Sequence, residues 1–366
     1  MENKLKSILF THDDLDGAGC RIIWELWNLT SSPNHWDVVN CSNYSIDNDV
    51  INFINNGNYS DDTLIAFGDI CPSKEVLETV IKKFKNVRIW DHHKTNLYVT
   101  EMLDTATIIP VNDEGVMECG TSLMFKAFSK YSKDNDTKLG FNYSNIYILV
   151  EMIRQYDTYD FKNTGFITPK LLMTLFKLCG MNNFVRKYVN KFSIEPFYKI
   201  LDTPDNDDVK EFDNLYTKYL IDKNDLDFVK VKIENENRII ESFSEKDIIN
   251  IKIPKTYSDG VGGVISPKDE FYNVALLCKT IPCNISDLAY TFLTKHPEYD
   301  FMASFDLSNY GTFQFRTVKN DINLGGSIAA PLGGGGHPKA AGASLNQESK
   351  QLLIDLIITA LGANKN

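Results

Sequence analysis

The stretch that decides the fold is NVRIWDHHKT, residues 86–95. Its first half is rich in branched and aromatic side chains, which favours a β-strand. Its second half ends that strand with a carboxylate and two imidazoles, Asp91, His92 and His93. Burying such a polar cluster without partners would be costly, so something must compensate it. A bound cation is the obvious candidate, because imidazole and carboxylate groups are common metal ligands.

Two other strand-like runs end in the same way. Residues 7–10 (SILF) run into THDDLDG at residues 11–17, and residues 64–67 (LIAF) run into Gly68 and Asp69. The carboxyl ends of parallel strands lie along one edge of a sheet, which is where ligands bind in such folds. The sequence therefore predicts that acids and histidines from three strands meet at one edge.

Strand and helix patterns alternate through the first half of the chain, which predicts parallel βαβ units. We expect strands at residues 6–10 and 36–39, and two more that end at Asp69 and Asp91. Helices are expected at residues 17–27, 49–55, 73–84, 120–131, 143–156 and 171–192, the last with an interruption at 180–183.

The pattern changes in the second half of the chain. A polar segment with a proline, residues 202–208, indicates a boundary or a surface loop. Residues 209–243 are charged with helical periodicity and are predicted to form one connecting helix. Short strands are expected at 249–253, 274–278, 301–306 and 312–317, with helices at 286–295 (capped by Asn284 or Ser286) and 348–361. We predict an α/β protein with a parallel-sheet domain at 1–200, a helical linker at 201–245 and a smaller α/β domain at 246–366.

Composition narrows the class of protein. The chain has 366 residues, 43% of them hydrophobic, and a formal net charge of −11. This charge gives long nucleic acid little electrostatic attraction, so phosphate must be bound locally. The N-terminus enters a strand at once and no apolar run is long enough to span a bilayer, so we expect neither a signal peptide nor a membrane segment. Seven cysteines without regular pairing are typical of a reducing cytoplasm.

Counting charges suggests how many cations the site would take. On its own, the His12-x-Asp14-x-Asp16-Gly17 motif is equally well interpreted as a solvated turn. Two further acids, Asp69 and Asp157, favour a metal site over a solvated turn. Asp157 follows an apolar helix, at the end where the helix dipole disfavours an acid. The four carboxylates of this set, Asp14, Asp16, Asp69 and Asp157, would balance two divalent ions. Oxygen-rich ligands favour Mn²⁺ or Mg²⁺ over structural Zn²⁺, and such a pair can clamp a phosphoryl group.

The motifs THDDLDG, FGD, WDHHKT and RQYDTYD, in this order, resemble those of the DHH phosphoesterase superfamily. GTSL and GGGGHPKAAGAS add a likeness to nanoRNase B-type oligoribonucleases, and the resemblance extends from His12 to about Ser344. It implies a set of metal ligands, in which Asp69 bridges two ions: His12, Asp14, Asp16, Asp69, His92 and Asp157. It also implies that His93 faces the scissile phosphate and that Asp91 supports the cluster. One departure is the single residue between His12 and Asp14, where several relatives have three.

The glycine run before His337 has two interpretations. In isolation it is typical of a flexible loop, but glycines also let backbone N–H groups approach an anion. Arg316 lies in the alternating strand FQFRT, and arginine suits phosphate. The resemblance implies that these groups hold the substrate: Arg316, Gly334, Gly335, Gly336 and His337. Arg154, one helical turn before Asp157, is a further candidate for phosphate binding, with a salt bridge as its alternative role.

These observations predict a cytoplasmic hydrolase, a two-metal phosphodiesterase that uses two Mn²⁺ ions, with Mg²⁺ as the alternative. The substrate would be a very short oligoribonucleotide or dinucleotide, and the products nucleoside 5′-monophosphates. Two alternatives are enzymatic: a nucleotide bisphosphate phosphatase, or a phosphodiesterase for linear or cyclic dinucleotides. A third is an inactive nucleic-acid-binding subunit, which would be expected to lack some of the metal ligands.

Overall fold

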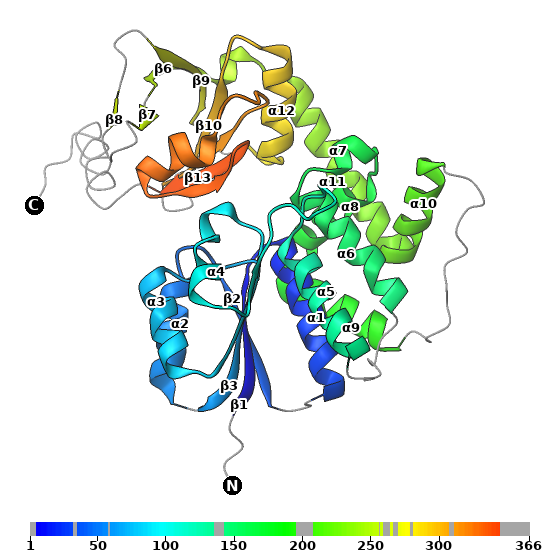
Figure 1. The fold of residues 1–366 in the computed structure, drawn as a ribbon. Helices are drawn as coiled ribbons and strands as arrows, with labels where there is room; N and C mark the ends of the chain where they lie inside the picture. The colour runs from blue at the N-terminus through cyan, green and yellow to red at the C-terminus, as the bar shows by residue number, and fades with distance from the viewer. Residues whose placement is uncertain are drawn as a thin grey trace, which may run out of the picture. The chain divides into compact units, whose positions relative to one another are not determined.

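The computed structural model describes residues 5–31, 35–57, 59–134, 143–194, 208–255, 257–258, 264–265, 270–278, 281–306 and 311–344. The chain divides into two compact units, Met1–Val231 and Lys232–Asn366 (Figure 1). The division falls inside one helix, α11 (Lys223–Ser242), which lies entirely within the predicted linker at 201–245. Within the described residues, no helix combines the length and the apolar character needed to cross a membrane.

The first unit is built on a parallel five-stranded sheet with the order β2-β1-β3-β4-β5. Its strands are β1 (Leu5–His12), β2 (Trp36–Cys41), β3 (Tyr59–Gly68), β4 (Asn86–Asp91) and β5 (Ala106–Ile108). The predicted parallel α/β class is therefore confirmed. The order reverses between β1 and β3, because the chain adds β2 on one side of β1 and every later strand on the other. Such a switch point is where parallel sheets bind ligands.

Helices cover both faces of this sheet (Figure 1). Alternate strand residues such as Ile8, Phe10, Ile65 and Phe67 face the core that lies under α2 (Ile46–Asn56) and α3 (Lys74–Lys83). On the other face, Trp90 lies against Phe128 of α5 (Gly120–Asp134), with ring centroids 5.5 Å apart. The remaining helices of this unit are α1 (Leu15–Ser31), α4 (Val99–Met102), α6 (Tyr143–Asp157), α7 (Phe161–Thr164), α8 (Thr168–Cys179), α9 (Met181–Ile194) and α10 (Val209–Leu220).

Two predictions for the helices need correction. Residues 209–243 do not form one helix but two, α10 and α11. Ile221 adopts an extended conformation and is buried, and the carbonyl of Asp222 accepts from Leu226 N at 2.8 Å. Aspartate is a favoured residue at a helix start, so this signal was available in the sequence. The interruption predicted at 180–183 is limited to Gly180, whose φ of 72° belongs to the left-handed region that suits glycine.

The second unit contains a mixed six-stranded sheet with the order β12-β13-β11-β10-β9-β6. Its elements are β6 (Ile249–Pro254), β9 (Phe271–Leu277), α12 (Ile285–Lys295), β10 (Phe301–Asp306), β11 (Thr312–Arg316), β12 (Gly335–His337) and β13 (Ala340–Ser344); β7 (Tyr257–Ser258) pairs separately with β8 (Val264–Ile265). Asn284 caps α12, as expected, by accepting from Ser286 N and Asp287 N. The predicted helix at 348–361 lies outside the described residues.

The glycine run is not simply a loop. Its second half forms β12, which pairs with β13 in antiparallel register. A Cβ atom at Gly334 would lie 2.0 Å from the carbonyl oxygen of Gly342, and Gly336 has a φ of 133°. Glycine is therefore required here because the two segments approach too closely for side chains.

Candidate metal centre

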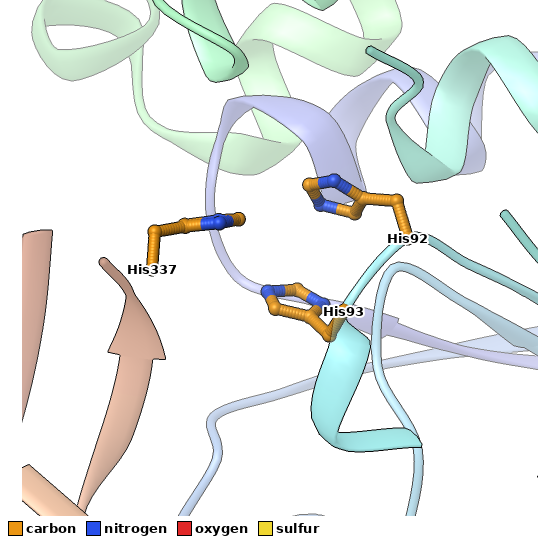
Figure 2. Close-up of side chains that lie close together, drawn as sticks. All are labelled: His92, His93 and His337. Carbon is orange, nitrogen blue, oxygen red and sulfur yellow. The ribbon is translucent and has the colours of Figure 1, made fainter. Parts of the chain in front are cut away.

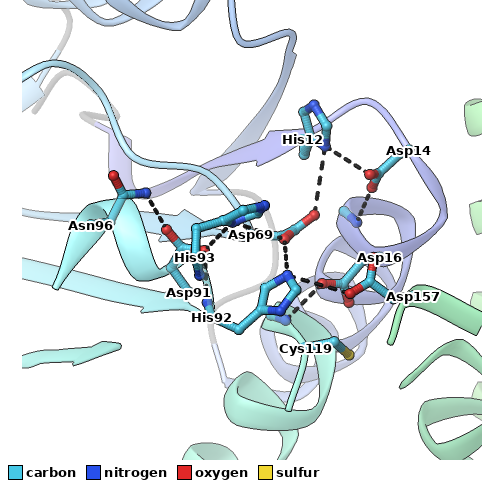
Figure 3. Close-up of polar contacts among 12 residues, drawn as sticks. His12, Asp14, Asp16, Asp69, Asp91, His92, His93, Asn96, Cys119 and Asp157 are labelled. Carbon is cyan, nitrogen blue, oxygen red and sulfur yellow. Dashed lines mark hydrogen bonds and ion pairs between the residues drawn. The ribbon is translucent and has the colours of Figure 1, made fainter. Parts of the chain in front are cut away.

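The predicted side chains of the first unit converge at the switch point of its sheet (Figure 3). His12 is the last residue of β1, Asp69 directly follows β3, and Asp91 is the last residue of β4. Asp16 lies in the first turn of α1. Asp157 is the last residue of α6, which brings a further acid to the same place.

Asp69 lies at the centre of the cluster. Its Oδ2 atom is 3.6 Å from His12 Nδ1, and its Oδ1 atom is 3.3 Å from His92 Nε2. His92 Nε2 is also 3.4 Å from Asp157 Oδ2. Asp69 Oδ1 and Asp157 Oδ2 are buried, and neither oxygen has a hydrogen-bond partner among the residues that the structure describes. Buried carboxylate oxygens rarely lack donors, so these two atoms indicate a site for a cation.

The backbone of Asp69 is held in an unusual conformation. Its φ of 59° lies in the left-handed region, which costs a non-glycine residue free energy and is common at functional sites. Asp69 N donates to Trp90 O at 2.9 Å, which ties the residue to β4. Gly120 packs directly against it, because a Cβ atom at Gly120 would lie 2.6 Å from Asp69 Cβ and 2.8 Å from Asp69 N. The start of α5 therefore fixes the central carboxylate.

The residues of the His12-x-Asp14-x-Asp16-Gly17 motif contact one another. His12 Nδ1 is 2.8 Å from Asp14 Oδ2, and Gly17 N donates to Asp14 Oδ1 at 2.9 Å. A Cβ atom at Gly17 would lie 1.9 Å from His12 O, which explains why glycine follows the acids. The other imidazole nitrogen, His12 Nε2, lies 3.4 Å from Asn43 Nδ2 in the loop after β2. The short spacing of this motif therefore still places the His12 side chain within the cluster.

Asp16 is held by the N-terminus of α5. Its two carboxylate oxygens accept from Gly120 N at 2.6 Å and from Thr121 N at 2.8 Å. These are orphan donors at the positive end of a helix dipole, so they stabilise a negative charge on Asp16. Each carboxylate oxygen keeps a second lone pair, and an oxygen of Asp16 lies within 4.8 Å of ligand atoms of His92 and Asp157.

Asp91 orients the two histidines through hydrogen bonds to their backbone N–H groups and to the His93 imidazole. The side chain is fully buried and accepts from His92 N at 2.7 Å, His93 N at 3.1 Å and Asn96 Nδ2 at 2.6 Å. His93 Nδ1 lies 2.6 Å from the same carboxylate. Although burial alone would raise the pKa of Asp91, these partners hold it well below its usual value. These are the contacts of a supporting residue, which orients other groups.

The two histidines differ in their surroundings. Both leave the segment that directly follows β4, with ring centroids 4.5 Å apart (Figure 2). The His92 side chain is buried and faces Asp69 and Asp157, whereas that of His93 is 30% exposed and turns Nδ1 towards Asp91. This asymmetry agrees with the different roles that the resemblance implies for them.

Protons compensate the crowded charges when no cation is bound. Burial raises the pKa of Asp157 to about 7 and also raises the pKa of Asp69, which lies near Asp16 and Asp14. For His12, burial opposes protonation, but Asp14 and Asp69 outweigh it and raise the pKa to about 11. A cation would displace these protons and satisfy the same oxygens. The donor set of carboxylates and imidazoles therefore fits a hard or borderline divalent ion.

Arg154 does not face this cluster with open donors. It donates to Glu151 through Nε at 2.9 Å and Nη2 at 2.6 Å, to Met117 O through Nη1, and to Asp160 through Nη2 at 2.9 Å. These bonds engage most of the guanidinium. They match the salt-bridge role considered as the alternative, and phosphate binding by Arg154 stays a prediction.

Two substrate-binding candidates of the second unit, Arg316 and His337, lie on β11 and β12, the strands on either side of β13. Arg316 at the end of β11 donates to Ser286 Oγ at 2.8 Å, and His337 is the last residue of β12 (Figure 2). Gly334 does not offer its backbone donor, because its N–H donates to Ala329 O at 2.9 Å. In this conformation Gly334 therefore has a steric role, and its part in substrate binding stays a prediction.

Sequence reasoning missed several residues of the site. Asn96 and Asn43 contact Asp91 and His12, but an asparagine in a loop carries no distinctive signal. Cys119 precedes α5, and its sulfur accepts from Ser122 N at 3.4 Å. Burial and the nearby Asp16 raise the pKa of this thiol. The GTSL motif could have identified Gly120, because a glycine followed by Thr-Ser is a plausible helix start for binding an anion.

Replacing Gly120 with alanine should disturb the site without changing the chemical identity of any candidate ligand. The new Cβ atom would collide with the backbone of Asp69, which must then shift. We expect Mn²⁺ affinity to fall by about 10- to 100-fold, the usual effect of losing support for a ligand. Titration calorimetry measures this loss, with Lys130→Ala, an exposed site on the same helix, as the control. Equal Mn²⁺ affinity in Gly120→Ala and the control would contradict the steric argument.

Comparisons with known proteins agree with this description. No family model matches the chain. The oligoribonuclease NrnB of Bacillus subtilis (strain 168) is 23% identical over 350 residues, which cover 94% of this chain and 74% of NrnB.

One solved structure shows a related fold. RecJ from Thermus thermophilus, solved with Mn²⁺, has a TM-score of 0.50 at 10% identity; the match covers 97% of this chain and 52% of RecJ. The chain therefore spans about half the length of that protein. A pGpG-specific phosphodiesterase from Vibrio cholerae, PggH, matches with a TM-score of 0.45 at 14% identity, over 98% of this chain and 100% of PggH. The ordered motifs of this chain, its parallel sheet with acids and histidines at the switch point, and its similarity to NrnB along most of its length support its resemblance to the nanoRNase B-like members of the DHH phosphoesterase superfamily.

Proposed function

We propose that the protein is a Mn²⁺-dependent phosphodiesterase that hydrolyses very short oligoribonucleotides to nucleoside 5′-monophosphates. The observation that carries this proposal is the pair of buried oxygens, Asp69 Oδ1 and Asp157 Oδ2, that lack hydrogen-bond donors within the described residues. Both lie beside His92 at the sheet edge where a parallel fold binds its ligand. The name of the Bacillus subtilis relative, an oligoribonuclease, supports the choice of substrate.

The arrangement of the ligands supports two ions. Candidate ligand atoms form two groups, each within 4.8 Å: His12, Asp14 and Asp69 in one, and Asp16, His92 and Asp157 in the other. Asp69 connects them, because one of its oxygens faces His12 and the other faces His92. When bound, a pair of divalent ions lowers the pKa of a water and neutralises phosphate charge.

The protein itself would position the substrate. His93 is held by Asp91, so its imidazole enters the site in one orientation and at little entropic cost. Burial opposes protonation of His93, but the neighbouring Asp91 favours it, and the net effect raises the pKa of His93. A protonated imidazole presents a donor and a positive charge to a phosphate oxygen. We propose that the second unit contributes Arg316, His337 and the β12 glycines Gly335 and Gly336 to substrate binding.

Turnover on RNAs of increasing length tests this function. An acidic protein binds a long strand weakly, so affinity must come from contacts around the scissile group. We expect the fastest turnover on RNAs of about two to a few nucleotides, with Mn²⁺ required and activity lost in chelator. Arg316→Ala should raise KM for a dinucleotide about tenfold, the effect of losing one charge-assisted contact, but leave hydrolysis of a small generic phosphodiester unchanged.

Three results would argue against the proposal. Wild-type preference for long RNA would reject the chosen substrate, as would turnover of a nucleotide 3′,5′-bisphosphate without turnover of a dinucleotide. Full activity in chelator would reject the metal. Equal loss on all substrates in Arg316→Ala would reject only the role of that arginine.

A further inference from the structure

Tyr159 is the second residue after Asp157 and has an unusual backbone conformation. Its φ is 61°, and with Asp69 it is one of two non-glycine residues in the described chain that have a positive φ. The residue occupies the position just beyond the end of α6, where helices prefer glycine. An aromatic residue there costs conformational free energy that a glycine would avoid. The protein therefore has a tyrosine at a position where the backbone conformation favours glycine.

The Tyr159 ring is held in place but is not buried. It lies 5.8 Å from the ring of Phe161 and 6.4 Å from that of Tyr156, the latter nearly parallel at 27°. Phe161 is buried and stacks on Tyr156 at 6°, so these two rings form a rigid support. Tyr159 remains 40% exposed at the outer side of this stack. Packing alone does not explain an aromatic side chain that leaves so much of its surface in water.

We propose that Tyr159 is a stacking platform for a nucleobase of the substrate, a specificity-determining contact that rests on the proposed function. Aromatic side chains bind bases by stacking, independently of sequence. A ring that is already immobilised loses little entropy when a base stacks on it. Two residues of chain, which span at most about 7 Å, separate Tyr159 from the candidate metal ligand Asp157, so a base attached to the phosphate that the centre would bind lies within reach of this part of the chain.

Equilibrium binding of two phosphates that differ in the base tests this proposal. AMP carries a base and ribose 5-phosphate does not, so the ratio of their affinities for the Mn²⁺-loaded protein measures the contribution of the base. We expect wild type to bind AMP at least about fivefold more tightly, the lower range for stacking. Tyr159→Gly should abolish this ratio and leave ribose 5-phosphate affinity unchanged, whereas Tyr159→Phe should preserve the ratio.

A matched control is Tyr147, a tyrosine of α6 that is 54% exposed. It lies ten residues before Asp157, which is about 15 Å along the helix axis. Tyr147→Ala should keep the ratio. A wild-type ratio near one, or a normal ratio in Tyr159→Gly, would overturn the platform while leaving the proposed function intact. Equal loss of both ligands in Tyr159→Gly would show a structural role instead. If wild type bound neither phosphate, the proposed function would fail as well.

Discussion

Asp69→Asn is expected to abolish hydrolysis and, at the same time, to make the metal-free protein more stable. Asparagine has nearly the same shape and tolerates the left-handed backbone of this position, so the fold should survive. The substitution removes the carboxylate that contacts both His12 and His92. Losing the several kcal/mol that metal ions contribute to a phosphoryl transition state corresponds to a fall in kcat/KM of roughly a thousandfold or more.

Although Asp69→Asn should lower activity, it should raise the stability of the metal-free protein, because the Asp69 carboxylate is buried beside other acids. Burial raises the folded-state pKa of Asp69 above its unfolded value near 3.8, so its contribution to stability is present at low pH and is lost as the pH rises through the folded pKa. At pH 8 in chelator, the wild-type protein must bury at this site a carboxyl group that is ionised in the unfolded chain, and Asp69→Asn need not. The variant should therefore unfold at higher urea concentration than wild type at pH 8, and the difference should shrink towards pH 4.

Mn²⁺ should reverse this order. Ions that bind only the folded state stabilise it, and we expect a large rise in the urea midpoint for wild type and almost none for Asp69→Asn. Asp104→Asn, at an exposed position of the same unit, is the control and should behave as wild type in both conditions. A variant that is less stable than wild type in chelator at pH 8 would refute the view that Asp69 is maintained for metal binding at a cost to stability.

The sequence was sufficient to predict which side chains of the strands meet. His12, Asp69 and Asp91 each end or follow a parallel strand, and strand periodicity together with βαβ topology places such residues at one edge. Asp157 was harder to place, because the end of a helix can lie anywhere around a sheet. Its assignment depended on the order of the motifs, and the structure shows it 3.4 Å from His92.

The features that the sequence did not reveal depend on long-range packing. The contact between Asp16 and the start of α5 joins residues 104 positions apart, and no local pattern indicates that these two segments meet. Asn96 is close in sequence to Asp91, but its role requires the 3₁₀ turn Lys94–Asn96 that brings the amide back. The break between α10 and α11 was missed for another reason: helical periodicity continues through Ile221, although this buried residue has an extended backbone.

The histidine pair provides the sharpest test of the division of roles at the centre. His92 is buried with Nε2 between Asp69 and Asp157, whereas His93 is more exposed and is held by Asp91 through Nδ1. We expect His92→Ala to lose bound Mn²⁺ and turnover together. His93→Ala should retain nearly normal Mn²⁺ content but lose turnover by about 10²- to 10⁴-fold, the range for a positioned proton-transfer or charge-stabilising group.

Metal analysis and steady-state kinetics on the same preparations separate these outcomes. His296→Ala, a histidine of the second unit that contacts Glu245 and Glu298, is the matched control and should leave both quantities unchanged. If His93→Ala lost as much Mn²⁺ as His92→Ala, His93 would be a ligand and Asp91 would orient a metal-binding imidazole. If His93→Ala kept both Mn²⁺ and turnover, the phosphate contact would have to come from elsewhere. Only retained metal with lost turnover supports the geometry in which one imidazole faces the ions and its neighbour faces the substrate.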